Sequence, residues 1–156
     1  MTRHVVKHSP CQLFTLGVLL CFFAALYGCN PRPQLTIEGG TAPLFKIAGP
    51  GRVQMLTVSG PDFNNPISSD AGSRYMKPYW QIVAEGDHDI ALLQQSGGVV
   101  YGKVPKGFKQ IFPEHGGAPQ PLSENELFTF DLRLANGEAL GMRFVIHNGK
   151  ASVEGS

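Results

Sequence analysis

The sequence predicts an all-β domain, an antiparallel β-sandwich, with a small β-barrel as the alternative. Glycine and proline are frequent in the 156-residue chain, with 19 and 12 residues, and this favours a turn-rich β protein. After residue 34, apolar residues alternate with polar ones far more often than they recur at helical spacing. No segment beyond the N-terminal apolar run predicts a helix long enough to join parallel strands, so we expect antiparallel pairing.

Short strands separated by turn residues are predicted for the first part of the domain. Residues 60–78 are rich in Pro, Asn, Ser and Gly and are expected to form a long loop. The strand that follows, 79–85, places Trp80, Ile82 and Ala84 on one face, and Gly86-Asp87 is expected to turn the chain. The strands predicted in this part are 34–37, 44–47, 52–59, 79–85, 90–94 and 99–101.

The clearest pattern lies near the C-terminus. Residues 128–134 alternate apolar and polar side chains, Asn136-Gly137 provides a two-residue hairpin turn, and the chain returns through 140–146. A second Asn-Gly pair, Asn148-Gly149, predicts a third strand and therefore a three-stranded meander. The segments before this meander, 104–108 and 113–121, contain Pro and Gly and are expected to be irregular loops.

Residues 122–135 resemble the corner of fibronectin type III-like and immunoglobulin-like sandwiches, where a Leu precedes an aromatic residue by six positions and a strand follows. Here the two residues are Leu122 and Phe128. In the family the aromatic residue is Tyr, whose hydroxyl bonds back to the chain; Phe128 lacks that hydroxyl. The resemblance implies that Phe128 fills the core and that Trp80 is the central core tryptophan of the sandwich.

The N-terminus has the composition of a secretion signal. The first residues carry basic side chains, among them Arg3 and Lys7, and no acidic one, and an apolar run extends from Leu13 to Gly28. A membrane-spanning helix needs about twenty predominantly apolar residues. This run is shorter and contains Thr15, which favours a cleaved signal over a membrane anchor.

Leu26-Tyr27-Gly28-Cys29, at the end of this run, resembles the lipobox of bacterial lipoproteins. The resemblance implies a signal peptide at 1–28, an acylated Cys29 carrying palmitate-type chains, a tether at 29–34 and one sandwich domain at 35–156. Two or more acyl chains anchor a protein stably to a bilayer. Asn30 after the cysteine implies the outer membrane, facing the periplasm or the cell surface. The alternatives are an ordinary thiol after a standard signal peptide, or an uncleaved membrane helix.

Cysteine content bears on disulfide bonds, and charge content bears on the binding partners to be expected. Cys11 and Cys21 lie in the leader, so an acylated Cys29 leaves no thiol for a disulfide, and the domain depends on its core for stability. The formal net charge is +1, and no basic cluster is interleaved with aromatic residues. We therefore expect a membrane partner through the lipid anchor, and no nucleic acid partner.

Catalytic motifs are absent from the sequence: it has no nucleophile elbow, no phosphate-binding glycine loop and no set of residues at metal-ligand spacing. We expect no enzymatic activity and no cofactor. The alternative is a periplasmic enzyme or a metal-binding accessory protein with a site at Asp87-His88-Asp89, because two carboxylates beside an imidazole can hold a divalent cation. Adjacent strand residues point to opposite faces, so this site would require a turn.

Binding is the function class that the sequence favours, with an envelope protein or a glycan as partner, or a structural role in an envelope assembly. Aromatic and basic side chains, which are enriched at interfaces, gather in two stretches, 63–79 and 101–112. The candidate contact residues are Arg74, Tyr75 and Tyr79 in the first stretch and Lys103, Lys106 and Phe108 in the second.

Overall fold

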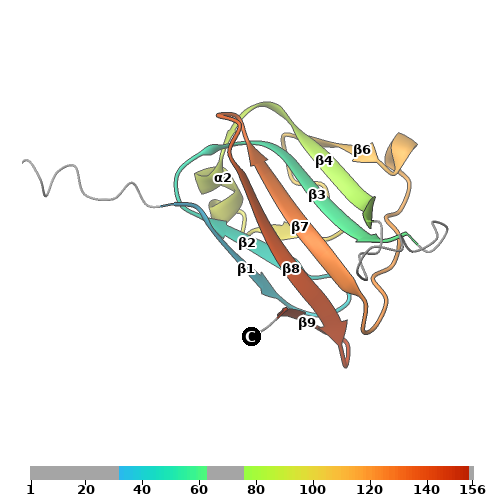
Figure 1. The fold of residues 1–156 in the computed structure, drawn as a ribbon. Helices are drawn as coiled ribbons and strands as arrows, with labels where there is room; N and C mark the ends of the chain where they lie inside the picture. The colour runs from blue at the N-terminus through green and yellow to red at the C-terminus, as the bar shows by residue number, and fades with distance from the viewer. Residues whose placement is uncertain (1–31, 63–75, 155–156) are drawn as a thin grey trace, which may run out of the picture. The chain divides into compact units, whose positions relative to one another are not determined.

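Two antiparallel β-sheets form the domain, so the predicted β-sandwich is confirmed (Figure 1). The computed structural model describes residues 32–62 and 76–154. The smaller sheet has the strand order β1-β2-β5 and the larger one β6-β4-β3-β7-β8-β9. Neither sheet closes into a barrel within these residues. The strands are β1 (Gln34–Glu38), β2 (Leu44–Ala48), β3 (Arg52–Pro61), β4 (Met76–Asp89), β5 (Val99–Val100), β6 (Phe108–Phe112), β7 (Leu127–Leu134), β8 (Ala139–His147) and β9 (Lys150–Val153).

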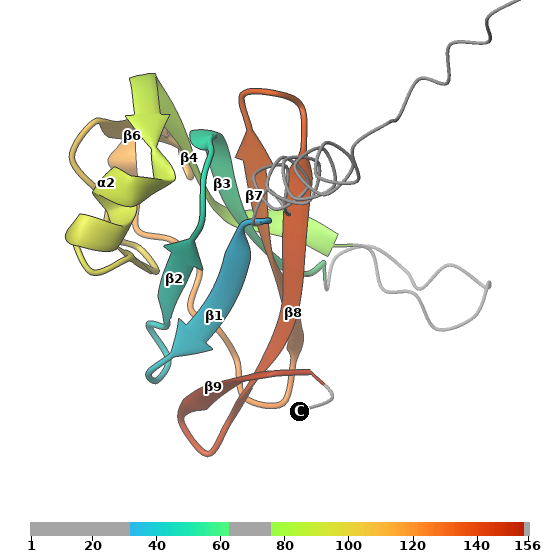
Figure 2. The same ribbon diagram turned by 90° about the vertical axis from the view of Figure 1, so that its left-hand side faces the viewer.

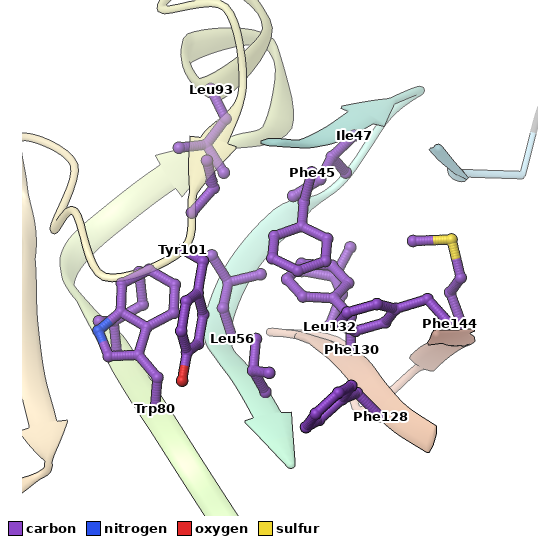
Figure 3. Close-up of a cluster of buried hydrophobic side chains, with 14 of the residues drawn as sticks. Phe45, Ile47, Leu56, Trp80, Leu93, Tyr101, Phe128, Phe130, Leu132 and Phe144 are labelled. Carbon is purple, nitrogen blue, oxygen red and sulfur yellow. The ribbon is translucent and has the colours of Figure 1, made fainter. Parts of the chain in front are cut away.

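The two sheets lie as two layers (Figure 2). Aromatic rings from both sheets meet in the core between them (Figure 3). Phe45 of β2 stacks on Phe130 of β7, with ring centroids 4.0 Å apart, and meets Phe144 of β8 edge to face at 5.6 Å. Phe128 and Trp80 are fully buried, as the sequence predicts. The burial of these rings removes large apolar surfaces from water and so helps to hold the layers together.

The C-terminal meander of β7, β8 and β9 confirms the alternation read from the sequence. Phe130 pairs with Met142 across β7 and β8. The first turn is one residue longer than predicted, because the Leu134 N–H bonds to the Glu138 carbonyl at 2.8 Å and leaves residues 135–137 as the loop. The second turn has two residues, Asn148 and Gly149, with φ of 51° and 70°, which is the geometry that makes Asn-Gly the preferred hairpin pair.

Two predictions are wrong in the region of β4 and the residues that follow it. Strand β4 continues through Gly86-Asp87, where the predicted turn is instead a large bulge: Met55 of β3 pairs with Val83, while Val53 pairs with His88. Residues 90–94, predicted as a strand, belong to the helix α2 (Ile90–Gln95). Ile90 and Leu93 are its buried residues, and their spacing of three places them on one helical face.

Strand β6 lies in a region where loops were expected at both ends. It pairs with β4, with Ala84 opposite Phe108. The Trp80 indole N–H donates to the Gln110 side-chain oxygen at 3.0 Å. Gln110 in turn donates to the carbonyls of Pro113 and Gly117, at 2.9 and 2.7 Å. This network fixes the segment around the short 3-10 helix η1 (Glu114–Gly116) to the strand.

The domain begins close to the expected tether. Residues 32–156 form one compact unit, Pro33 is buried, and β1 starts at Gln34. The predicted signal peptide, 1–28, and Cys29 lie outside the described residues. Within 32–62 and 76–154, no helix has the length and apolar character needed to cross a membrane.

Candidate functional site

A groove opens on the surface between α2 and the segment that enters β6. Its volume is about 570 Å³, larger than two other hollows of about 480 and 330 Å³. We call it the α2 groove. Its lining residues are His88, Leu92, Leu93, Gln95, Ser96, Pro105, Lys106, Gly107 and Phe108.

Pairing between β4 and β6 brings these distant segments together. Ala84 lies opposite Phe108, and the Glu85 N–H donates to the Gly107 carbonyl at 2.8 Å. The bulge in β4 then carries the chain to His88, two residues before α2 begins at Ile90. One side of the groove therefore comes from β4 and α2, and the other from residues 105–108.

The imidazole of His88 forms part of the groove wall. It stacks on the Phe108 ring with centroids 5.1 Å apart and an interplanar angle of 30°. Gly107 has φ +82°, and a Cβ placed on it would overlap the imidazole. The bare backbone of Gly107 therefore lets the His88 ring lie flat against the loop.

Within residues 32–62 and 76–154, the groove carries one positive charge, on Lys106, which lies on the side formed by residues 105–108. Lys106 is exposed, and in the described part of the chain its ammonium group has no ion-pair partner. The ring nitrogens of His88 make no hydrogen bond within the same residues. Asp87 pairs with Arg52 at 3.0 Å. The groove is therefore apolar, with one ammonium group that has no ion-pair partner and two imidazole nitrogens that make no hydrogen bond among the described residues.

The Asp87-His88-Asp89 triplet does not form the metal site proposed as an alternative. Asp87 is engaged by Arg52, His88 stacks on Phe108, and Asp89 is the exposed residue that precedes α2. Among residues 32–62 and 76–154, no group of three His, Cys, Asp or Glu side chains is arranged to hold a metal ion.

Two of the three aromatic contact residues predicted for the surface, Tyr79 and Phe108, are instead buried. Tyr79 is 1 % exposed, and its hydroxyl donates to the Pro61 carbonyl at 3.0 Å. Burial, and secondarily the carboxylates of Glu126 and Asp62, raises the pKa of the Tyr79 phenol. Phe108 is 6 % exposed and lines the α2 groove beneath His88. Tyr79 and Phe108 fold inward because their apolar surface is large.

The remaining predicted residues have different positions. Lys106 lines the α2 groove, whereas Lys103 is exposed and lies outside its lining. Arg74 and Tyr75 lie outside the described residues. The structure thus brings together Lys106 and Phe108 from the predicted contact stretch and His88 from the alternative metal site.

Sequence reasoning missed the α2 side of the groove. Leu92 is 50 % exposed and lines the opening with Leu93, Gln95 and Ser96. The available signal was the spacing of Ile90 and Leu93, which fits a helix and leaves Leu92 facing outward. An exposed Leu beside an apolar hollow is a feature of binding surfaces.

Protein-family models give no match to the chain, and searches of curated proteins and of solved structures give no match either.

Proposed function

We propose that this chain is a lipid-anchored protein of the bacterial envelope and that its sandwich is a non-enzymatic binding module. The observation that carries the binding role is the convergence of His88, Lys106 and Phe108 on the α2 groove. Binding sites for ligands are typically concave and apolar, with a few placed polar groups. The apolar lining favours an apolar ligand, or an apolar part of a partner, over a glycan.

The anchor is supported by the signal-like leader and by Leu26-Tyr27-Gly28-Cys29 at its end. Only residues 30–32 separate Cys29 from Pro33, which is buried. Four Cα–Cα steps span at most about 15 Å. An acylated Cys29 would therefore keep the domain close to a bilayer surface.

Metabolic labelling tests the anchor. In a bacterial host supplied with labelled palmitate, we expect the natural chain to take up label and to fractionate with membranes, because two or more acyl chains give stable binding. Cys29→Ser should remove both properties. Cys11→Ser, which changes a leader cysteine outside the lipobox, is the matched control and should keep them. Equal labelling of the Cys29 variant and the natural chain would refute the anchor.

Site-specific crosslinking tests the binding role. A photo-reactive amino acid at Leu92, in the α2 groove, should give an adduct in envelopes that the same group at Arg133, an exposed residue of β7, does not give. Both positions are at the surface, so the natural fold should tolerate both changes. Identical crosslinking patterns at the two positions would show that the groove is not the binding site.

A further inference from the structure

We propose that the α2 groove binds a single-chain carboxylate, a molecule with one apolar chain and one carboxylate head. The inference rests on the proposed role of the groove as the binding site and does not depend on acylation of Cys29.

The apolar part of the groove can receive a hydrocarbon chain. Leu93 and Phe108 are 3 % and 6 % exposed and form its floor, and Leu92, which is 50 % exposed, stands at its opening. Pro105 completes the wall opposite α2. A chain lying in this groove would remove the exposed part of Leu92 from water, which is favourable in proportion to the apolar area covered.

The polar part selects an anion. Among the described residues, Lys106 is the only Lys, Arg, Asp or Glu side chain that lines the groove, and it has no ion-pair partner there. His88 adds ring nitrogens that are not hydrogen-bonded there. A carboxylate accepts hydrogen bonds from both kinds of group, and such charge-assisted bonds are the stronger ones. The nearby Asp87 is held by Arg52.

Size and composition favour this ligand over two others. The volume of about 570 Å³ lies within the range of small-molecule sites, about 300–1,000 Å³. A phosphate group is usually held by arginine forks or by backbone N–H groups at a helix start, and within residues 32–62 and 76–154 no arginine lines the groove. A glycan would require more polar partners than the four polar lining residues provide, which are His88, Gln95, Ser96 and Lys106.

An NMR titration tests the proposal on the mature chain, residues 29–156 with Cys29→Ser, which contains the whole compact unit. The probe is decanoate below its micellar concentration, and the control is decyltrimethylammonium, with the same chain and opposite charge. We expect decanoate to shift the amide signals of His88, Leu92 and Gly107. We also expect it to bind about tenfold more tightly than the cation, a difference that one charge-assisted contact can supply.

Three variants sharpen the test. Lys106→Gln should weaken decanoate binding about fivefold to tenfold and leave binding of the cation unchanged or stronger. Lys103→Gln removes an exposed lysine outside the groove and should change neither. Leu92→Asp should abolish decanoate binding, and because Leu92 is half exposed, the rest of the amide spectrum should stay that of the folded protein.

Several outcomes would overturn the proposal. They are the absence of decanoate shifts, equal affinity for the cation, shifts outside the groove, or binding only to phosphatidylglycerol vesicles or to a peptide ending in leucine. A partner crosslinked at Leu92 together with no decanoate binding would keep the groove as the binding site and refute the carboxylate. Loss of palmitate labelling would refute the anchor alone.

Discussion

The imidazole of His88 stacks on the phenyl ring of Phe108, with centroids 5.1 Å apart. The two residues come from neighbouring strands, β4 and β6, and both line the α2 groove. His88 is placed there by the bulge that follows Val83. An irregularity in one strand thereby positions a polar ring on an apolar surface.

Gly107→Ala should disrupt this arrangement. The residue has φ +82°, and the new methyl group would overlap the His88 ring. Gly116 has φ +70° with nothing within 4 Å of its Cβ position, so Gly116→Ala measures the conformational cost alone, about 1–2 kcal/mol. We expect Gly107→Ala to cost about 1–3 kcal/mol more because of the overlap. Urea unfolding measures both, and equal losses would contradict the contact.

Phe128→Ala should destabilise the sandwich strongly. The ring is fully buried and contacts Tyr79 and Phe144, with centroids 5.8 and 5.5 Å away. Removal of a buried Phe side chain costs about 3–5 kcal/mol. Arg133→Ala, on the exposed face of the same strand, is the control and should stay within about 0.5 kcal/mol of the natural chain. Similar free energies of unfolding for both variants would mean that the faces of β7 are reversed.

Tyr101 predicts a loss of stability at alkaline pH. Its hydroxyl donates to the Gln120 carbonyl at 2.6 Å, and burial, followed by the nearby Tyr79, raises the pKa of the phenol above its ordinary 10.0. Below pH 10 the Tyr101 phenol is neutral in both the folded and the unfolded state, so its full contribution to the free energy of unfolding is present. Above pH 10 the unfolded phenol ionises first, so the free energy of unfolding falls, by at most about 1.4 kcal/mol per pH unit.

Tyr101→Phe should separate the effect of the hydrogen bond from the effect of phenol ionisation. At pH 7 the variant loses a hydrogen bond, at a cost of about 1 kcal/mol. Between pH 10 and 12 its free energy of unfolding should fall less steeply than that of the natural chain. Parallel pH profiles from urea unfolding would show that the Tyr101 phenol is not shielded from ionisation in the folded state.

Asp87→Ala and Asp89→Ala distinguish the groove from the alternative metal site. The ion pair of Asp87 with Arg52 is exposed, 81 % and 56 % for the two side chains, and such pairs contribute about 0–1 kcal/mol. We expect both variants to bind decanoate as the natural chain does, and to have the same metal content as the natural chain. A divalent cation bound stoichiometrically to the natural chain and lost from the variants would favour the metal-binding function.

The fold could be predicted where local pattern and tertiary structure agree. The β7–β8–β9 meander has strict alternation and two Asn-Gly pairs, which together determine strands and turns. Residues 90–94 were assigned wrongly because five apolar and polar residues fit a strand as well as one helical turn. Their helix is determined by packing of Ile90 and Leu93, which a short sequence pattern does not specify.

The candidate site was predictable only in its separate parts. Lys106 and Phe108 were selected for their residue types, and His88 for its flanking carboxylates. Their meeting depends on the pairing of Ala84 with Phe108, a contact between strands that local sequence does not encode. Tyr79 shows the opposite case, because an aromatic residue beside a long loop was assigned to the surface and instead closes the core against Gly60.

Intact mass spectrometry of the protein isolated from bacterial envelopes tests the proposed anchor most directly. A chain that lacks residues 1–28 and carries a diacylglyceryl group on the Cys29 sulfur is the expected result. An unmodified cysteine at this position, or a chain that keeps its leader, would contradict the proposal that the domain works while bound to a bilayer.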